Sequence, residues 1–301
     1  MQRLLGPQLG IMNLIHDQIG IMPSCFSSPP EKRASADDHA ISRSGQSVYM
    51  SVYRTKLAGQ CRFITVTWCR NLLLHGLSVA VQGCDGASPQ YACKIELNPL
   101  YFWKKQGSKR FSVEGKSVFV FWDLKIARFS GEAEPESEYY VAVVSDGEVA
   151  LLLGNLRKEA YRKTGCRPSL IDPILVSRKE HIFGKKRFVT RVKFHERGSF
   201  NEIVILIENT NRSSEGQEME IQINGIRAIH VGHLEWKFRG NQSIDLNKSR
   251  IDVYWDVHDW LFNPGLRHGL FIFKPKSQKI IDSDNDTDIE FCLFIYAWKL
   301  E

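Results

Sequence analysis

The sequence predicts an all-β protein made of a tandem pair of similar antiparallel β-sandwich or β-barrel domains with one short connecting helix. Short alternating or β-branched runs, bounded by Gly, Asp, Pro or Asn, follow one another through both halves of the chain, as strands and turns do. A second observation is a repeated pattern, because residues 103–124 and 236–257 align without a gap and match Trp122 with Trp255. The repeat indicates a shared scaffold and says little about activity.

Length and composition predict two domains. The chain has 301 residues, more than a usual single domain, and 43% of them are hydrophobic, which is enough for two cores. The stretch before the first strand run is polar and rich in Pro and Ser, as flexible segments are. The expected organisation is a flexible leader over 1–46, a first β domain over 47–154, a basic connector with a short helix over 155–185, a second β domain over 186–275, and an atypical tail over 276–301.

Two dipeptides predict tight hairpins. Asp146-Gly147 separates two apolar runs in the first half, and Asn224-Gly225 does the same in the second half. Two-residue hairpin turns need positive φ at both positions, which Asn, Asp and Gly adopt most readily. Each dipeptide therefore predicts an antiparallel strand pair.

Alternation within the first copy of the repeat predicts which side chains face the core. Val118, Val120 and Trp122 are two residues apart, so they share one face of a strand. The opposite face carries Phe119 and Phe121. An apolar second face predicts that this strand is covered on both sides, with the other domain as the expected cover.

One helix is expected between the halves. Asn155 is the predicted N-cap, and Leu156 and Ala160 are spaced to share a helix face. Gly165 and Pro168 follow the last basic residues and predict the end of the helix.

Basic residues are concentrated around this connector. Twelve Lys or Arg and three acids lie between residues 156 and 193, whereas the net charge of the whole chain is +6. Clustered cations attract lipid headgroups, phosphorylated proteins or nucleic acid. The expected anion-binding residues are Arg178, Lys179, Lys185, Lys186 and Arg187. The alternative is a solvated linker whose charges pair with acids such as those of residues 131–138.

The motifs of several enzyme classes are missing from the sequence. It contains no G-x-S-x-G, no phosphate-binding G-x-x-x-x-G-K-[ST], and no cysteine pairs at the spacing of a structural zinc site. We therefore expect no cofactor and no metal, and the balance leans against an enzyme. The weak catalytic candidates are Asp256 and His258, since a carboxylate beside an imidazole can form an acid–base pair. An aspartate at the end of a strand more commonly fixes a turn.

The cysteines predict a reducing environment. There are seven, an odd number, and none forms a C-x-x-C pair, so we expect reduced and mostly buried thiols. No apolar run is long enough to cross a bilayer. The expected location is intracellular, cytoplasmic or nuclear.

Several long segments resemble a known plant family. RSGQSVYMSVYRTKLAGQCRFITVTWCRNLLLHGLSV, YYVAVVSDGEVALLLG and VYWDVHDWLFNPGLRHGLFIFKP are similar to the family catalogued as domain of unknown function 868. The resemblance covers about Asp17 to Pro275, and the tail over 276–301 departs from it. It implies a plant origin and supplies no catalytic residues.

Two functions remain in competition. The first is a non-enzymatic interaction or binding module whose basic connector contacts an anionic lipid surface or a phosphorylated protein, rather than nucleic acid. The second is a β-barrel-type protein that binds or transforms a small apolar ligand within or between its domains. A deep apolar cavity at Asp256 and His258 would favour the second, and filled cores with a flat basic face would favour the first.

Overall fold

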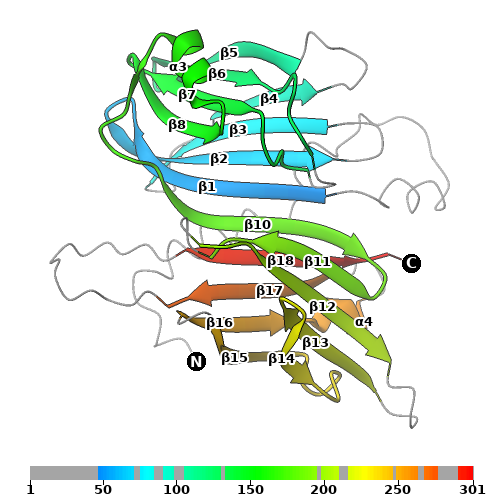
Figure 1. The fold of residues 1–301 in the computed structure, drawn as a ribbon. Helices are drawn as coiled ribbons and strands as arrows, with labels where there is room; N and C mark the ends of the chain where they lie inside the picture. Colours follow the sequence, from blue (N-terminus) through cyan, green and yellow to red (C-terminus); the bar gives the residue numbers. More distant parts are fainter. Residues whose placement is uncertain are drawn as a thin grey trace, which may run out of the picture.

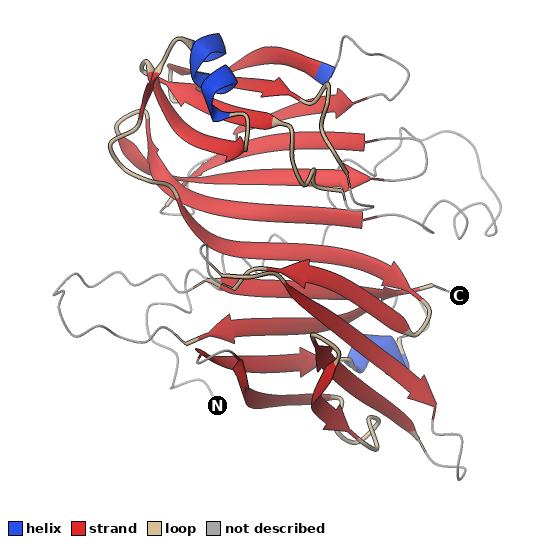
Figure 2. Cartoon of the chain, in the orientation of Figure 1, coloured by secondary structure: helices blue, strands red, loops and turns tan. Residues whose placement is uncertain are grey.

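The computed structural model describes residues 47–70, 75–84, 91–97, 105–129, 133–194, 198–209, 216–246, 249–263, 268–276 and 291–300, and the expected leader lies outside this part of the chain. Within these residues the protein is nearly all β, which confirms the predicted class (Figure 2). The strands of the first half are β1 (Ser47–Leu57), β2 (Gln60–Arg70), β3 (His75–Gly83), β4 (Tyr91–Leu97), β5 (Gln106–Val113), β6 (Lys116–Asp123), β7 (Tyr140–Ser145), β8 (Glu148–Gly154) and β9 (Arg167–Pro168). Those of the second half are β10 (Ile174–Gly184), β11 (Arg187–Val192), β12 (Asn201–Asn209), β13 (Gln217–Ile223), β14 (Ile226–Val231), β15 (Arg239–Leu246), β16 (Ser249–Asp256), β17 (His268–Pro275) and β18 (Cys292–Lys299). The helices among the described residues are α3 (Arg157–Thr164) and α4 (His258–Phe262).

One nine-stranded sheet runs through both halves (Figure 1). Its strand order is β15-β16-β17-β18-β10-β1-β2-β3-β4. A five-stranded sheet of β5 to β9 packs against the part of this sheet formed by β1 to β4. A four-stranded sheet of β11 to β14 packs against the part formed by β15 to β18. Each half is thus a pair of packed sheets with its own core, and the two halves share a continuous layer.

The two cores lie between the paired sheets. In the first half, Trp68 and Val79 of the shared sheet meet Val120 and Val143 of the five-stranded sheet. At the border of this half, the Thr55 hydroxyl donates to the Ala150 carbonyl at 3.1 Å, joining the edges of β1 and β8. In the second half, a separate cluster of buried side chains joins β11 to β14 with β15 to β18. Since side chains pack the two cores, a ligand-binding site is expected at the junction between the halves.

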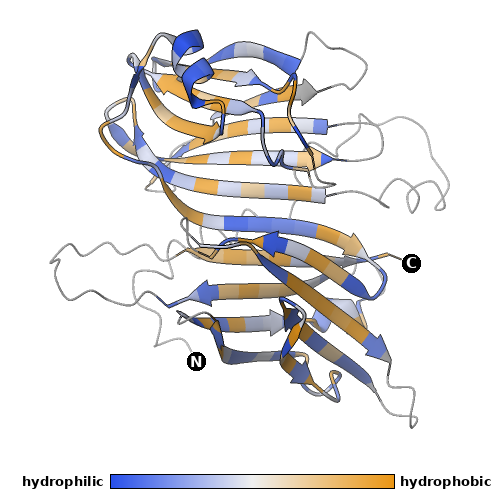
Figure 3. Ribbon diagram, in the orientation of Figure 1, coloured by the Kyte–Doolittle hydropathy of each residue, from blue (hydrophilic) through white to orange (hydrophobic). Residues whose placement is uncertain are grey.

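Strand β10 lies at the centre of the shared sheet, between β1 and β18. Residues 174–184, which the sequence assigned to the connector, therefore form a central strand rather than a linker. The polar stretch in the middle of β10 is flanked by apolar ends (Figure 3). Because this stretch lacks alternating apolar residues, the sequence pattern does not indicate a strand there.

The C-terminal residues also belong to the shared sheet. β18 runs parallel to β10 and antiparallel to β17, so the pairing is not antiparallel throughout. Leu293, Ile295 and Ala297 are completely buried in the core of the second half. The apolar end of the expected tail is therefore an integral strand, and its apolar character follows from its position between two other strands.

Both predicted hairpins are confirmed. Asp146 and Gly147 have φ of 53° and 75° and join β7 to β8, and Asn224 and Gly225 have φ of 52° and 77° and join β13 to β14. Positive φ at both positions is the feature that such turns require.

Helix α3 covers one half of the molecule rather than bridging the two. Its buried Ala160 packs on the outer face of β7 and β8, with Phe119 and Phe121 at the margin of the same cluster. The helix, and not the other domain, is therefore the cover of this second apolar face. Asn155, the predicted N-cap, does not cap the helix, because its side chain accepts hydrogen bonds from the backbone N–H groups of the 138–139 loop. Gly165 ends the helix in a left-handed conformation, as expected.

The repeated pattern forms two locally similar hairpins, β5–β6 and β15–β16. Gly107 lies opposite Trp122 in the first, and Gly240 lies opposite Trp255 in the second. Trp122 is buried in its core, and Trp255 packs against the other core while partly exposed.

Candidate ligand-binding site

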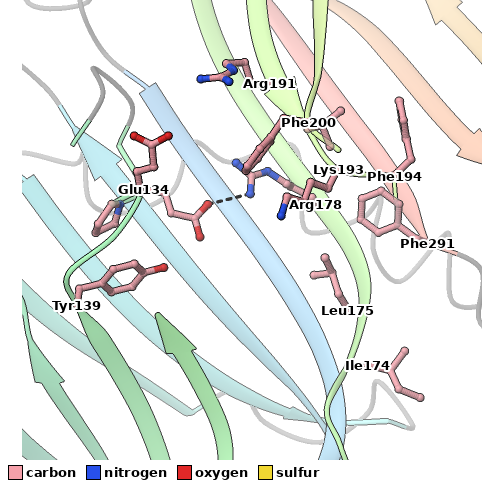
Figure 4. Close-up of a pocket in the computed structure, with 13 residues that line it drawn as sticks. Glu134, Tyr139, Ile174, Leu175, Arg178, Arg191, Lys193, Phe194, Phe200 and Phe291 are labelled. Atoms are coloured by element: carbon pink, nitrogen blue, oxygen red, sulfur yellow. Dashed lines mark hydrogen bonds and ion pairs between the residues drawn. The ribbon is translucent and has the colours of Figure 1, made fainter. Parts of the chain in front are cut away.

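A cavity of about 540 Å³ lies at the junction of the two halves, where β10 passes between them (Figure 4). Its size falls within the range of pockets that hold small molecules. The residues that line it come from the loop before β7, from β10, from the end of β11 and the segment after it, and from the residue before β18. They are Glu134, Pro135, Glu136, Tyr139, Ile174, Leu175, Arg178, Arg191, Val192, Lys193, Phe194, Phe200 and Phe291. We call this cavity the junction pocket.

Two walls of the junction pocket carry opposite charges. Glu134 and Glu136 stand on the side of the first half, and Arg191 and Lys193 on the side of the second. The Arg191 guanidinium carbon is 5.5 Å from the centre of the Phe200 ring, and the Lys193 ammonium is 4.6 Å from it. A cation at this distance from an aromatic face is attracted by the ring quadrupole, so Phe200 holds both cations at the pocket.

The rest of the lining is mainly apolar. In Figure 4, Phe194 and Phe291 lie to the right of Lys193, and Leu175 and then Ile174 lie below them. Ile174 is 45% exposed and Phe200 is 52% exposed. Such exposure of large apolar side chains leaves the pocket open to a partner that could cover them.

Arg178 stands between the two charged walls and belongs to a buried ion-pair network. Its Nη1 is 2.8 Å from Glu134 Oε2, and its Nε is 2.5 Å from Glu180 Oε1. Glu180 is completely buried and also accepts a hydrogen bond from the Thr190 hydroxyl. The guanidinium carbon of Arg178 lies 5.1 Å from the centre of the Tyr49 ring. This network joins β10 to the loop before β7 on one side and to β11 on the other.

The charges around Arg178 keep it protonated. Burial acts to lower its pKa, but the carboxylates of Glu134 and Glu180 outweigh burial and hold the pKa above its ordinary value. Two carboxylates thus compensate this one cation, and a ligand anion would have to compete with them.

Tyr139 contributes a neutral phenol to the pocket. Burial raises its pKa, and the nearby Glu134 charge adds to the effect. Its ring meets Trp68 edge to face, with 5.9 Å between the ring centres. The hydroxyl therefore stays protonated at physiological pH and is fixed in orientation by the first core.

The structure does not bring the five expected anion-binding residues together. Arg178 faces the junction pocket, whereas Lys179, the next residue in the strand, faces the opposite side of the sheet and is only 5% exposed. Burial lowers the pKa of Lys179 to about 8. Lys185, Lys186 and Arg187 are exposed at the turn from β10 to β11. Strand alternation separates Arg178 from Lys179, and the other three residues lie at the turn after β10, so the expected patch becomes a pocket residue, a buried residue and an exposed basic turn.

Arg178 does pair with the acidic stretch at residues 131–138, the alternative partner expected from the sequence. Glu134 of that stretch is the residue that binds Arg178. The other pocket residues were missed because their spacing carries no local signal.

Asp256 and His258 lie outside the junction pocket. Asp256 Oδ1 accepts the backbone N–H of His258 at 3.0 Å, and Oδ2 is 2.7 Å from Arg239 Nε. The His258 imidazole instead lies 3.2 Å from Asp259, through Nδ1. Asp256 therefore fixes the turn into α4, and its carboxylate does not orient the His258 imidazole.

Metal ligands are likewise not assembled in the part of the chain that the structure describes. Within that part, no group of three or more His, Cys, Asp or Glu side chains could hold a metal ion. No helix among the same residues is long and apolar enough to cross a membrane.

Fold and site define a class of protein with two packed-sheet halves and a ligand-sized pocket between them. The chain belongs to the family described as plant protein of unknown function (DUF868), which matches residues 44–299. The match begins later than the resemblance in the sequence suggested, and it extends through β18. No curated protein matches the chain.

Proposed function

We propose that this protein is a non-enzymatic binding module whose junction pocket holds a small ligand with an apolar body and one anionic group. The observation that carries the proposal is the pairing of an apolar lining with two cations held at one wall. Among the described residues, Arg191 and Lys193 have Phe200 as their aromatic partner and no carboxylate within ion-pair distance. They are therefore the cations best placed to meet a ligand anion.

The apolar part of the ligand would supply most of the affinity. Each 100 Å² of apolar surface removed from water contributes about 2.5 kcal/mol, before the cost of immobilising the ligand is subtracted. Phe194, Phe291 and Leu175 offer the apolar contacts. Arg191 and Lys193 would then fix the orientation of the ligand.

The acidic wall supports a small monoanion over a polyanion. Glu134 and Glu136 stand across the pocket from the two cations, and Glu134 is already bound to Arg178. A second anionic group on the ligand, or the backbone of a nucleic acid, would be repelled at this wall.

The lining also supports binding rather than catalysis. The described pocket residues include no His, Cys, Ser or Thr, so the lining lacks the usual hydroxyl and thiol nucleophiles and the imidazole that activates them, and the acid–base groups present are Glu134, Glu136, Tyr139 and Lys193. The phenol of Tyr139 is held neutral by its raised pKa, which suits a hydrogen-bond donor to the ligand.

The test uses the fluorescent aromatic sulfonate ANS as the probe, with competition by a medium-chain alkyl carboxylate and by the alcohol of the same length. Arg191→Gln/Lys193→Gln should weaken the binding of ANS and of the carboxylate at least tenfold, and it should leave the weaker alcohol unaffected. Lys185→Gln/Lys186→Gln removes two exposed cations outside the pocket and is the matched control. Equal effects of the two double variants, or no effect of the first, would refute the proposal.

A second candidate function rests on the exposed basic turn formed by Lys185, Lys186 and Arg187. Three cations near an anionic membrane contribute about 1 kcal/mol each, which supports weak and salt-sensitive binding. An anionic lipid surface or a phosphorylated protein is the proposed partner. Co-sedimentation with phosphatidylserine vesicles at low and high salt tests the lipid arm. Binding that survives replacement of all three residues by Gln would exclude the turn.

We also propose that the two halves descend from one duplicated unit within an intracellular protein. Each half has two successive groups of four strands, β1–β4 then β5–β8, and β11–β14 then β15–β18. The paired hairpins with Gly opposite Trp support the same origin. Superposition of the two halves tests the duplication, and a fluorescent fusion in plant cells tests a cytoplasmic or nuclear location.

A further inference from the structure

Two cysteines meet at one end of the shared sheet, away from the residues that line the junction pocket. In the antiparallel β2–β3 ladder, Arg62 is paired with Gly83, so the next positions outward are Cys61 and Cys84. The distance between their Sγ atoms is 2.6 Å. This is longer than a disulfide bond, at about 2.04 Å.

The backbone already has the spacing of a disulfide. Residues directly opposite in an antiparallel pair have Cα atoms about 4.5 to 5.5 Å apart. Disulfides span Cα distances of about 4.4 to 6.8 Å. The register thus places Cys61 and Cys84 at a spacing that a disulfide can bridge.

Access to solvent separates the two thiols from three of the other described cysteines, while Cys166 is partly exposed as well. Cys61 is exposed and Cys84 is partly exposed, whereas Cys69, Cys93 and Cys292 are buried. An oxidant in solution can therefore reach Cys61 directly. Cys84 rests against a small buried cluster that includes Val176 of β10.

We propose that Cys61 and Cys84 form a redox-active pair that closes into a reversible disulfide between β2 and the end of β3. The oxidant is a low-molecular-weight disulfide such as oxidised glutathione. This proposal is independent of the ligand proposed for the junction pocket, since neither cysteine lines that pocket.

The chemistry assigns a different role to each sulfur. Burial raises the pKa of Cys84 to about 12, and its hydrogen bond with Cys61 adds to the shift, so Cys84 keeps its proton. The exposed Cys61, as thiolate, attacks one sulfur of the oxidised glutathione. The S–S bond breaks, a mixed disulfide forms at Cys61, and one glutathione thiolate leaves.

Cys84 then completes the exchange. Its sulfur attacks the Cys61 sulfur of the mixed disulfide, its proton passes to solvent, and the second glutathione thiolate leaves and takes up a proton. Two protein thiols are oxidised and one glutathione disulfide is reduced to two thiols. An excess of reduced glutathione reverses the same steps.

The experiment equilibrates the reduced full-length protein with glutathione buffers of increasing oxidised fraction, then blocks free thiols with acid and an alkylating reagent. Mass spectrometry of the intact protein should show two alkyl groups fewer than on the fully reduced protein, and digestion should yield one peptide pair joined through Cys61 and Cys84. The bond should disappear again with excess reduced glutathione, and the oxidised form should unfold at a higher temperature because its unfolded chain is cross-linked.

Three variants sharpen the result. Cys84→Ser should accumulate the mixed disulfide at Cys61, and Cys61→Ser should form neither product. Cys166→Ser, which alters another partly exposed thiol, should behave as the parent protein. A bond from either residue to a different cysteine, or two free thiols at Cys61 and Cys84 in fully oxidised glutathione, would overturn the proposal.

Discussion

Gly240 lies directly opposite Trp255 across β15 and β16, and a Cβ atom on Gly240 would overlap the Cζ2 atom of the indole. The indole lies over the glycine, and its Nε1 donates to the Lys237 carbonyl at 3.1 Å. In the first half a Cβ on Gly107 would come to 2.9 Å from the corresponding atom of Trp122. The Gly and Trp of the repeated pattern are therefore two sides of one packing contact.

Gly240→Ala should destabilise the protein, because the methyl group must displace either the indole or the strand. Overpacking of this kind costs about 1–3 kcal/mol. Gly107→Ala should cost less, since its contact is longer. Urea unfolding measures both effects, and Gly232→Ala, where a Cβ meets nothing within 4 Å, is the matched control. Equal stabilities of the Gly240→Ala and Gly232→Ala proteins would contradict the packing argument.

A smaller ring should relieve the strain of the same substitution. Trp255→Phe alone loses apolar contacts and the hydrogen bond to Lys237, and so should be destabilising. In the double variant with Gly240→Ala the total cost should be less than the sum of the two single costs. Additive costs in a double-mutant cycle would show that the methyl group and the indole do not meet.

Arg178→Met should be strongly destabilising. The substitution leaves Glu180 buried without its cationic partner, and breaking a buried pair from one side costs about 3–5 kcal/mol. Arg178→Met/Glu180→Gln should recover part of this loss, because Gln carries no charge and can still accept from the Thr190 hydroxyl. Chemical unfolding of the three proteins provides the measurement. A double variant no more stable than Arg178→Met would place the cost in lost packing.

His181 should make the protein acid-sensitive. Its Nδ1 accepts the Trp298 indole N–H at 3.0 Å, and its ring stacks on Tyr296 with 4.7 Å between centres. Burial, followed by the charges of Lys179 and His268, lowers its pKa from 6.5 to about 4. The unfolded chain binds a proton in this interval and the folded protein does not, so stability is present above pH 6.5 and is lost as pH falls toward 4.

His181→Asn should flatten this dependence, since the Asn amide oxygen can replace Nδ1 as the acceptor and does not titrate. The stability advantage of the parent protein over the variant should shrink by on the order of 3 kcal/mol between pH 6.5 and pH 4. Urea unfolding across that interval measures the difference. Parallel stability curves would show that His181 is not the group responsible.

Lys179 should act in the alkaline range. Burial lowers its pKa in the folded protein from 10.5 to about 8, so the unfolded chain holds the proton more tightly between these values. The stability of the parent protein relative to Lys179→Met should therefore rise as pH increases from 8 to 10.5, by on the order of 3 kcal/mol. Below pH 8 the difference should be constant. A difference that does not change with pH would mean that Lys179 is solvated in the folded protein.

The sequence pattern predicted the structure correctly where the contacts are local. The core face of β6 is confirmed, since Val118 and Val120 are completely buried, and so are the hairpins at 146–147 and 224–225. A strand exposes every second side chain to the same layer, and a tight turn requires particular backbone angles. Both requirements act within a few residues and therefore leave a pattern in the sequence.

Alternation failed for β10, where five consecutive polar residues occupy the middle of a central strand. Their charges are accommodated by partners distant in the chain: Glu134 binds Arg178, and Thr190 binds Glu180. A polar stretch of this kind is indistinguishable from a linker until those partners are known. Only Arg178 and Lys179 of the expected anion-binding patch lie in this stretch, and strand alternation places them on opposite faces of the sheet.

The sequence by itself determined the class of fold, the repeated hairpins and the main turns of this protein, because each depends on neighbours in the chain. Only the tertiary structure decided that β10 and β18 unite the halves in one sheet, and that Tyr139, Arg191 and Phe200 surround one pocket. Those residues meet because β10 holds the loop before β7 against the end of β11. Contacts between segments so far apart are selected by the packing of whole sheets, which no local spacing of residues encodes.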